Sequence, residues 1–302
     1  MKAIPQFAVT PAMVTSDVAE PSPGETVWVA ASYALGAEVI VIGTLHNKYE
    51  CILAGASATS PELDPARWKY IGKTNKYALF DSYRNTPTTK SLSMSVEVTP
   101  GKRFNAAAVM GAVGEILRLV MTVGATTVWD SGNIDLRLRK TARWYEYFFG
   151  PFSFTGSKIF FNLPPYSGAK LTMTISRTAG DVSCGVLAVG NEVYIGKMLS
   201  QARSEALNFS TIERDLDGQA VVTPRPTKPA TTQTLVADAS SIESVRSLRS
   251  LGNAVPIIFS GLDDHDSNPY FEALLIQGVY TEFTIGLPNM NRFETSLSVQ
   301  EL

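Results

Sequence analysis

The stretch SLSMSVEV, residues 91–98, alternates polar and apolar side chains with a period of two. Successive side chains of a β-strand point to opposite faces of a sheet, so this pattern is typical of a half-buried strand. Further short runs rich in β-branched and aromatic residues lie at 104–110, 126–129, 158–161, 170–175 and 184–190. Residues 115–123 fit a strand or a short helix. Many short strands separated by turn residues predict a β-sandwich or jelly roll over residues 70–200.

Upstream of this region we expect two smaller pieces. Residues 26–69 contain three short runs with strand composition, punctuated by Gly and Pro, and predict a small three-stranded β module. Residues 1–25 contain four prolines and no helical period, which predicts an extended N-terminal arm. The prolines argue against a central strand, so its apolar side chains either pack on the chain's own body or reach a neighbouring subunit. The apolar residues expected to make these contacts include Ile4, Phe7, Val9 and Met13.

The last hundred residues, 201–302, differ in character and predict a mixed β region with one helix. Residues 209–215 and 217–222 fit a hairpin, and the prolines that follow place that piece at an edge or in a linker. The helix is expected near 240–251, because apolar residues recur there with helical spacing. Ser240 and Glu243 have the spacing of a capping box at its start, and Gly252 ends it.

Composition and charge exclude several classes of protein. The chain is 45% hydrophobic and 18% charged, which argues against disorder, and no apolar run approaches the length of a membrane span. The N-terminal residues lack the apolar core of a secretory signal. A net charge of −2 gives no general attraction to nucleic acid. Thirteen basic and eight acidic residues lie in 61–150, against seven basic and thirteen acidic in 201–302, a distribution that suits self-association or arises by chance.

The residues needed for common catalytic chemistries are scarce, so we expect no enzyme and no cofactor. His46 and His265 are the two histidines, and Cys51 and Cys184 are the two cysteines, which predict buried thiols. Asp215 and Asp217 sit at alternate positions, as paired acids would, but without the signature of an aromatic-lined cleft.

An acidic cluster offers a weak metal candidate. Asp263, Asp264 and Asp266 place oxygen ligands close together, as a hard divalent cation requires. The segment lacks the glycine and terminal glutamate of a calcium-binding loop, and the preceding Gly261 favours a solvated turn instead. We therefore expect no bound metal.

Four aromatic residues in the small module raise a glycan-binding hypothesis, because flat rings stack on the apolar faces of sugars. These are Trp28, Tyr33, Tyr49 and Trp68. The alternative is that the same rings form the core of so small a module. These four residues, together with YALGAEV at 33–39, resemble the small carbohydrate-binding modules of chitinases. In those modules an aspartate follows the glycine, whereas Ala37-Glu38 follows it here.

A second resemblance covers more of the chain. PARWKYIGKTNKYALFD at 65–81 is similar to a segment common in virion proteins of tailed bacteriophages, and so are FSTIERDLDG at 209–218 and SVQEL at 298–302. The resemblance implies a structural protein of the tail tip or baseplate, like a distal tail protein, in which a galectin-like or jelly-roll sandwich follows the small module. Such a protein would be made in the host cytoplasm, reside in the virion, and form a homo-oligomeric ring with other tail proteins. The alternative is a glycan-binding adhesin that contacts the host envelope.

Overall fold

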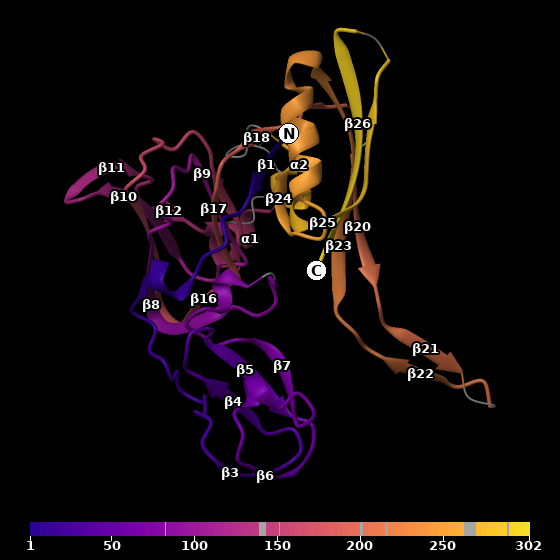
Figure 1. Cartoon of the computed structure of the whole chain (residues 1–302). Helices are drawn as coiled ribbons and strands as arrows, with labels where there is room; N and C mark the ends of the chain where they lie inside the picture. Colours follow the sequence, from indigo (N-terminus) through magenta and orange to yellow (C-terminus); the bar gives the residue numbers. More distant parts are fainter. Residues whose placement is uncertain are drawn as a thin grey trace. The chain divides into compact units, whose positions relative to one another are not determined.

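The structure is a computed structural model that describes residues 1–81, 83–138, 143–150, 152–199, 202–214, 217–262, 270–288 and 290–302. Strands make up 51% of the chain, so the predicted mainly β fold is confirmed. The chain divides into two compact units: unit 1 contains residues 1–6 and 190–302, and unit 2 contains residues 7–189. The colours of Figure 1 follow the sequence, so unit 2 runs from indigo to rose and most of unit 1 is salmon, orange and yellow. Unit 2 is therefore an insertion in the sequence of unit 1.

The alternating stretch forms the end of strand β8 (Thr88–Val98) in unit 2. Met94, Val96 and Val98 are fully buried, whereas the residues between them lie on the outer face. Strand β8 pairs antiparallel with β16 (Ala169–Cys184), which places Val96 opposite Met173. The buried positions of both strands thus line the same face, as the period of two requires.

Two sheets enclose the core of unit 2. The first has the order β11-β10-β16-β8-β2, with β12 beside β10, and the second has the order β15-β9-β17. Side chains of both sheets meet in one hydrophobic cluster, so the two sheets form a sandwich. The remaining strands are β2 (Val14–Ser16), β9 (Ala106–Met110), β10 (Ile116–Val123), β11 (Thr126–Asp130), β12 (Ile134–Asp135), β15 (Lys158–Phe160) and β17 (Val186–Gly190). Residues 116–123, which fitted both periods, form a strand.

The small module also belongs to unit 2. It contains the three-stranded sheet β4-β5-β7 and the two-stranded sheet β3-β6, rather than three strands alone. Its strands are β3 (Ala31–Tyr33), β4 (Glu38–Val41), β5 (Asn47–Cys51), β6 (Gly55–Ser57) and β7 (Trp68–Lys73). Short 3-10 helices at Pro11–Met13, Pro61–Leu63 and Ala78–Phe80 join these elements. Unit 2 also has a two-stranded sheet, β13 (Arg137–Leu138) with β14 (Ser153–Phe154), and helix α1 (Trp144–Phe149) between them.

Unit 1 is an antiparallel sheet of order β18-β1-β24-β25-β26-β23-β19, with β20 also paired to β23. Helix α2 (Ile242–Leu251) packs Val245 and Leu248 into the core of this sheet. The strands are β1 (Lys2–Pro5), β18 (Val193–Tyr194), β19 (Lys197–Met198), β20 (Arg203–Asn208), β23 (Thr227–Asp238), β24 (Ile257–Ser260), β25 (Leu275–Gly286) and β26 (Arg292–Glu301). A short helix α3 (Phe271–Leu274) precedes β25.

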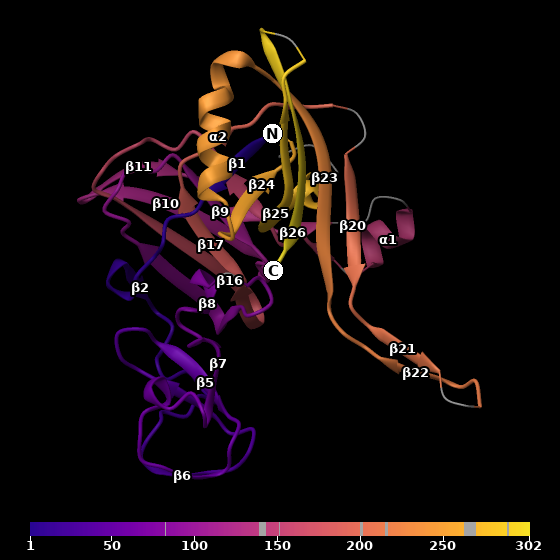
Figure 2. The same ribbon diagram turned by 45° about the vertical axis from the view of Figure 1, so that its right-hand side comes forward.

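The predicted hairpin in the C-terminal region is confirmed. Strands β21 (Thr211–Arg214) and β22 (Ala220–Thr223) pair antiparallel and continue the ribbon that β20 and β23 form (Figures 1 and 2). Pro229 lies in β23 where that strand pairs with β20 but not with β26. A proline is tolerated there because only one side of the strand needs backbone donors.

The predicted capping box is wrong. Helix α2 begins at Ile242 after a 3-10 turn at Ala239–Ser241, its N-cap is Ser241, and no side chain caps it. The Ser241 hydroxyl donates instead to the carbonyl oxygen of Asp238. The 3-10 turn leads the chain directly into the helix, with the Ile242 N–H bonded to the Ala239 carbonyl.

The expectation that prolines keep the N-terminal segment out of a central strand is also wrong. Strand β1 lies between β18 and β24, and Ile4 is fully buried. Pro5 is tolerated because it is the last residue of β1. In unit 2, Phe7 and Val9 pack against the sandwich core, and Met13 is half-buried in a 3-10 helix. These residues pack on their own chain, the alternative that the sequence left open.

Candidate functional site

The four aromatic residues of the small module form its core. Tyr49 and Trp68 are buried with Val39 and Cys51, and Trp28 and Tyr33 pack against them. Trp68 is 2% exposed, so neither face of its ring is open to a sugar. Its indole N–H donates to the Ser57 hydroxyl at 3.1 Å.

The remaining rings are held by contacts within the module. The rings of Tyr33 and Trp68 meet edge to face, with centroids 5.0 Å apart. The Tyr33 hydroxyl donates to the carbonyl oxygen of Val29 and accepts from its N–H. The arrangement therefore stabilises a small core, and it does not present a platform of open rings.

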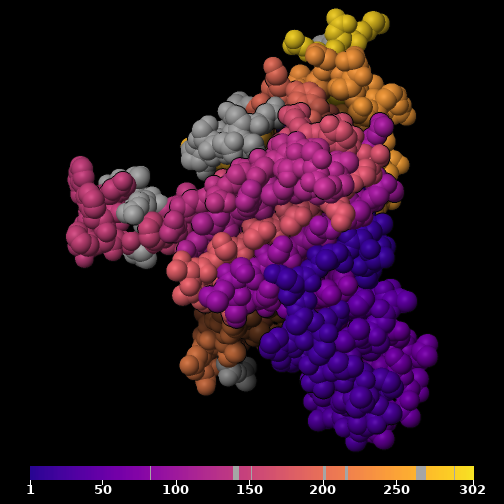
Figure 3. All heavy atoms as spheres, turned by 90° about the vertical axis from the view of Figure 1, so that its left-hand side faces the viewer, coloured from indigo at the N-terminus to yellow at the C-terminus, as the bar shows by residue number. Residues whose placement is uncertain are grey.

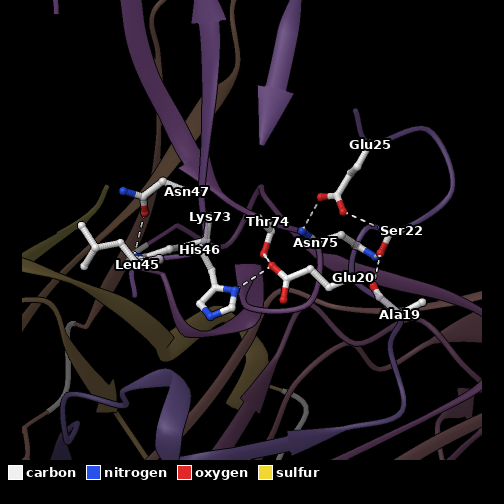
Figure 4. Close-up of polar contacts among 10 residues, drawn as sticks. All are labelled: Ala19, Glu20, Ser22, Glu25, Leu45, His46, Asn47, Lys73, Thr74 and Asn75. Carbon is white, nitrogen blue, oxygen red and sulfur yellow. Dashed lines mark hydrogen bonds and ion pairs between the residues drawn. The ribbon is translucent and has the colours of Figure 1, made fainter. Parts of the chain in front are cut away.

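A network of buried polar contacts lies beside this module in unit 2 (Figure 4). One oxygen of Glu20 accepts hydrogen bonds from His46 Nδ1 at 2.8 Å and from the Thr74 hydroxyl at 2.7 Å. The side chain of Glu20 is 6% exposed. The carboxylate thus joins the segment before the module to two of its loops.

Neighbouring contacts extend the network to the sandwich. Glu25 accepts from the backbone N–H groups of Ser22 and Asn75, both at 2.7 Å (Figure 4). The Asn75 side chain in turn donates to the Thr89 carbonyl oxygen and accepts from the Thr89 N–H, at the start of β8. These bonds connect the small module to strand β8 of the sandwich.

A groove of about 750 Å³ runs along these contacts. Its lining includes charged groups that already have partners, such as Asp17, which pairs with Lys90 at 2.7 Å. Lys73 donates to Asn47 and to the Leu45 carbonyl oxygen, and burial lowers its pKa. Because its polar groups bind one another, the groove is best explained as the seam between the module and the sandwich.

The reactive residue types lie apart from each other. His46 faces Glu20 rather than Cys51, whose thiol contacts the carbonyl oxygen of Leu53. Both cysteines are buried and free, and burial raises the pKa of Cys184 to about 12. Asp217 is exposed on the hairpin, whereas Asp215 lies outside the described residues.

The candidate metal ligands Asp263, Asp264 and Asp266 also lie outside the described residues, as does His265. Among the residues that the structure describes, no group of three or more His, Cys, Asp or Glu side chains could hold a metal ion.

Helix α1 gives unit 2 a different kind of surface. It contains Trp-Tyr-Glu-Tyr-Phe-Phe, and none of its residues is buried. Phe152 and Phe154 follow it, and together these exposed rings form what we call the aromatic cluster: Trp144, Tyr145, Tyr147, Phe148, Phe149, Phe152 and Phe154. Trp144 is 80% exposed and stacks on Phe148 at 5.8 Å. In Figure 3 this rose-coloured segment stands clear of the sandwich strands.

Arginine side chains lie against the aromatic cluster. The guanidinium group of Arg137 lies 5.6 Å from the ring centre of Phe152, and that of Arg177 lies 5.9 Å from the ring centre of Phe154. Arg143 is exposed and precedes α1 directly. The outer face of β8, β16 and β10, also visible in Figure 3, is by contrast polar and carries the ion pair Lys170–Glu97.

The hairpin β21–β22 exposes apolar side chains in unit 1. Ile212 is 67% exposed and lies opposite Val222, which is also exposed. Val221 lies opposite Glu213, so apolar groups occur on both faces of the ribbon. The sequence predicted this hairpin but gave it no function. The aromatic run at 143–150 was visible in the sequence, whereas its exposure was not.

Comparisons with known proteins leave the family open. No protein-family model matches the chain, and no curated protein matches it at a significant level. In the part of the chain that the structure describes, each helix is too short or too polar to cross a membrane.

Proposed function

We propose that the protein is a structural component of a bacteriophage tail, at the tail tip or baseplate, and that it acts by assembling with further copies and other tail proteins. The observation that carries the proposal is the aromatic cluster around α1. A helix in which five of six residues are aromatic is normally buried, yet none of the residues in α1 is buried in the single chain. A surface of this kind marks a contact with another molecule.

The setting in a phage tail rests on the similarity of residues 65–81 and 209–218 to virion proteins. The polar groups of the groove bind one another, which favours a structural role over catalysis. The alternative function, a glycan-binding adhesin, loses support because Tyr49 and Trp68 are buried in the module core.

Sedimentation velocity over a wide concentration range, followed by electron microscopy of the same samples, tests the proposal. We expect a defined oligomer that appears in micrographs as closed rings. A chain that stays monomeric at every concentration would contradict the proposal.

A further inference from the structure

We infer that the aromatic cluster of one copy binds the hairpin β21–β22 of a second copy. The inference rests on the proposed function, because it names the two surfaces through which copies join. The aromatic cluster belongs to unit 2 and the hairpin belongs to unit 1. Each copy would therefore contribute one surface of each kind.

Helix α1 needs packing against a partner to be stable. The helix has six residues, and isolated helices shorter than about 12 residues are marginal in water. Glu146 is the single charged residue within it. Packing against a second molecule would supply the burial that α1 lacks within its own chain.

The area of the cluster suits a specific interface. Aromatic side chains bury about 150–250 Å² each, so seven rings at the observed exposures offer on the order of 600–1,000 Å². The largest apolar patch on a typical monomer is about 300–600 Å². A standard interface buries about 800 Å² per partner, which the cluster alone matches.

The hairpin β21–β22 offers an apolar surface that fits the rings. A two-stranded hairpin on its own is marginally stable, and β21–β22 pair with each other rather than with the eight-stranded sheet. Ile212 and Val222 lie opposite each other and form a narrow aliphatic surface. Such a surface packs well on exposed rings, because aromatic and β-branched side chains make favourable neighbours.

The charges of the two surfaces are complementary. Arg143 and Arg177 accompany the rings, and Arg137 is partly neutralised by its ion pair with Asp135. Among its described residues the hairpin carries two exposed acids, Glu213 and Asp217, beside one exposed base, Arg214. The basic rim around the rings attracts the two acids of the hairpin, and Arg214 must point away from that rim, which favours one orientation of docking over others.

When two different surfaces bind each other, each added copy leaves one free surface of each kind, so the assembly grows in one direction. Copies joined in this way form a closed ring if the rotation between them closes, and a filament if it does not. The inferred contact therefore agrees with the ring expected of the proposed tail component.

Complementing variants test the inference with the full chain. In the first variant Trp144→Ser, Phe148→Ser and Phe149→Ser remove the rings, and in the second Ile212→Ser and Val222→Ser remove the aliphatic surface. We expect each variant alone to be monomeric in sedimentation velocity. A mixture of the two should form a one-to-one dimer and nothing larger, because one intact contact remains.

A matched control uses exposed apolar residues elsewhere. Leu287→Ser and Met290→Ser remove comparable side chains from unit 1, and Met290 is 97% exposed. This control should assemble as the wild type does. Circular dichroism of every variant checks that its strands are intact.

A charge exchange gives an independent test. Arg143→Glu with Arg177→Glu should weaken association at least tenfold, and so should Glu213→Lys with Asp217→Lys. A chain that carries all four changes should regain wild-type association to within a few fold. Failure of the combined variant to recover would overturn the inferred pairing.

The outcomes separate the two proposals. A monomeric wild type contradicts the proposed function and the inference together. A wild type that assembles, with variants that assemble equally well, contradicts the inference alone. Monomeric variants that fail to dimerise on mixing show that the two surfaces bind something other than each other.

Discussion

At the scale of single residues, burial decides what an aromatic or polar side chain does. Trp68 and Trp144 are chemically alike, but the first is enclosed by the small module and the second is exposed on α1. The sequence allowed both a core and a sugar-stacking role for Trp68, and packing selects the core. The contacts of Glu20 could not have been predicted, because His46 and Thr74 lie 26 and 54 residues away along the chain.

Cys184 provides a test of burial in the sandwich core. Its pKa is raised to about 12, because the thiolate would be desolvated. The raised pKa keeps the thiol protonated at pH 8.5, whereas the thiolate is the form that reacts with alkylating reagents. We expect iodoacetamide to leave Cys184 unmodified in the folded protein and to modify it in urea, as measured by mass spectrometry of the peptides. Equal labelling in both conditions would contradict the burial.

Glu20→Gln tests the polar network. The substitution removes a nearly buried carboxylate that accepts hydrogen bonds from His46 and Thr74. A hydrogen bond to a charged group contributes about 1.5–3 kcal/mol to stability. We expect the free energy of unfolding of unit 2 to fall by about 1–3 kcal/mol. The four tryptophans, at 28, 68, 129 and 144, all lie in unit 2, so their fluorescence in urea reports this unit.

The control for this substitution is Glu38→Gln. Glu38 pairs with Lys48 at the surface, and its side chain is half exposed. Such pairs contribute about 0–1 kcal/mol. An equal effect of both substitutions would show that the network adds nothing beyond a surface ion pair.

At the scale of elements, a local sequence pattern predicts a strand or a helix correctly when one face of the element is buried and the other is solvated. Residues 93–98 meet this condition, and the strand predicted at 91–98 is confirmed, whereas Leu92 breaks the alternation of burial because it is 53% exposed. The run at 144–149 does not, because five of its six residues are aromatic and the single Glu146 sets no period that would reveal a helix. The start of α2 shows a different limit: a capping box is a local signal, and the 3-10 turn before the helix shifts the cap by one residue.

Helix α2 yields a prediction that contrasts packing with capping. Leu248 is buried against the sheet of unit 1, so Leu248→Ala should lower the free energy of unfolding of this unit by about 2–5 kcal/mol. Ser240→Ala should change it by less than about 0.5 kcal/mol, because Ser240 is not the N-cap. Urea unfolding followed by circular dichroism measures both. A larger effect of Ser240→Ala would show that the Ser240 side chain caps the helix after all.

At the scale of the whole molecule, the division of the chain into units was the least accessible to sequence reasoning. Runs and turns locate strands, but they do not reveal that residues 2–5 pair with residues 257–260. Such a pairing leaves no local signature, because it depends on contacts between the two ends of the chain. The same holds for the small module, whose link to the sandwich passes through Asn75 and Thr89.

Deletion of residues 2–6 tests this architecture. The change removes β1 from between β18 and β24, so we expect unit 1 to lose its cooperative unfolding transition in circular dichroism. The tryptophan transition of unit 2 should stay within about 0.5 kcal/mol of the wild type. Lys2→Ala, which keeps the backbone of β1 and removes only a partly buried pair with Glu192, is the control and should preserve both transitions. An intact unit 1 after the deletion would show that β1 is dispensable.

The place of β1 in the sheet also governs how the protein matures during translation. The ribosome releases β1 about 250 residues before its partner β24, a delay of roughly 10–50 s at ordinary elongation rates. During that time unit 2 can fold vectorially, while the strand that precedes it waits without its neighbours. A chain whose synthesis stops early never completes unit 1. A chain truncated before β24 therefore leaves one edge of β1 unpaired, and such a product exposes the apolar surface that chaperones and proteases recognise.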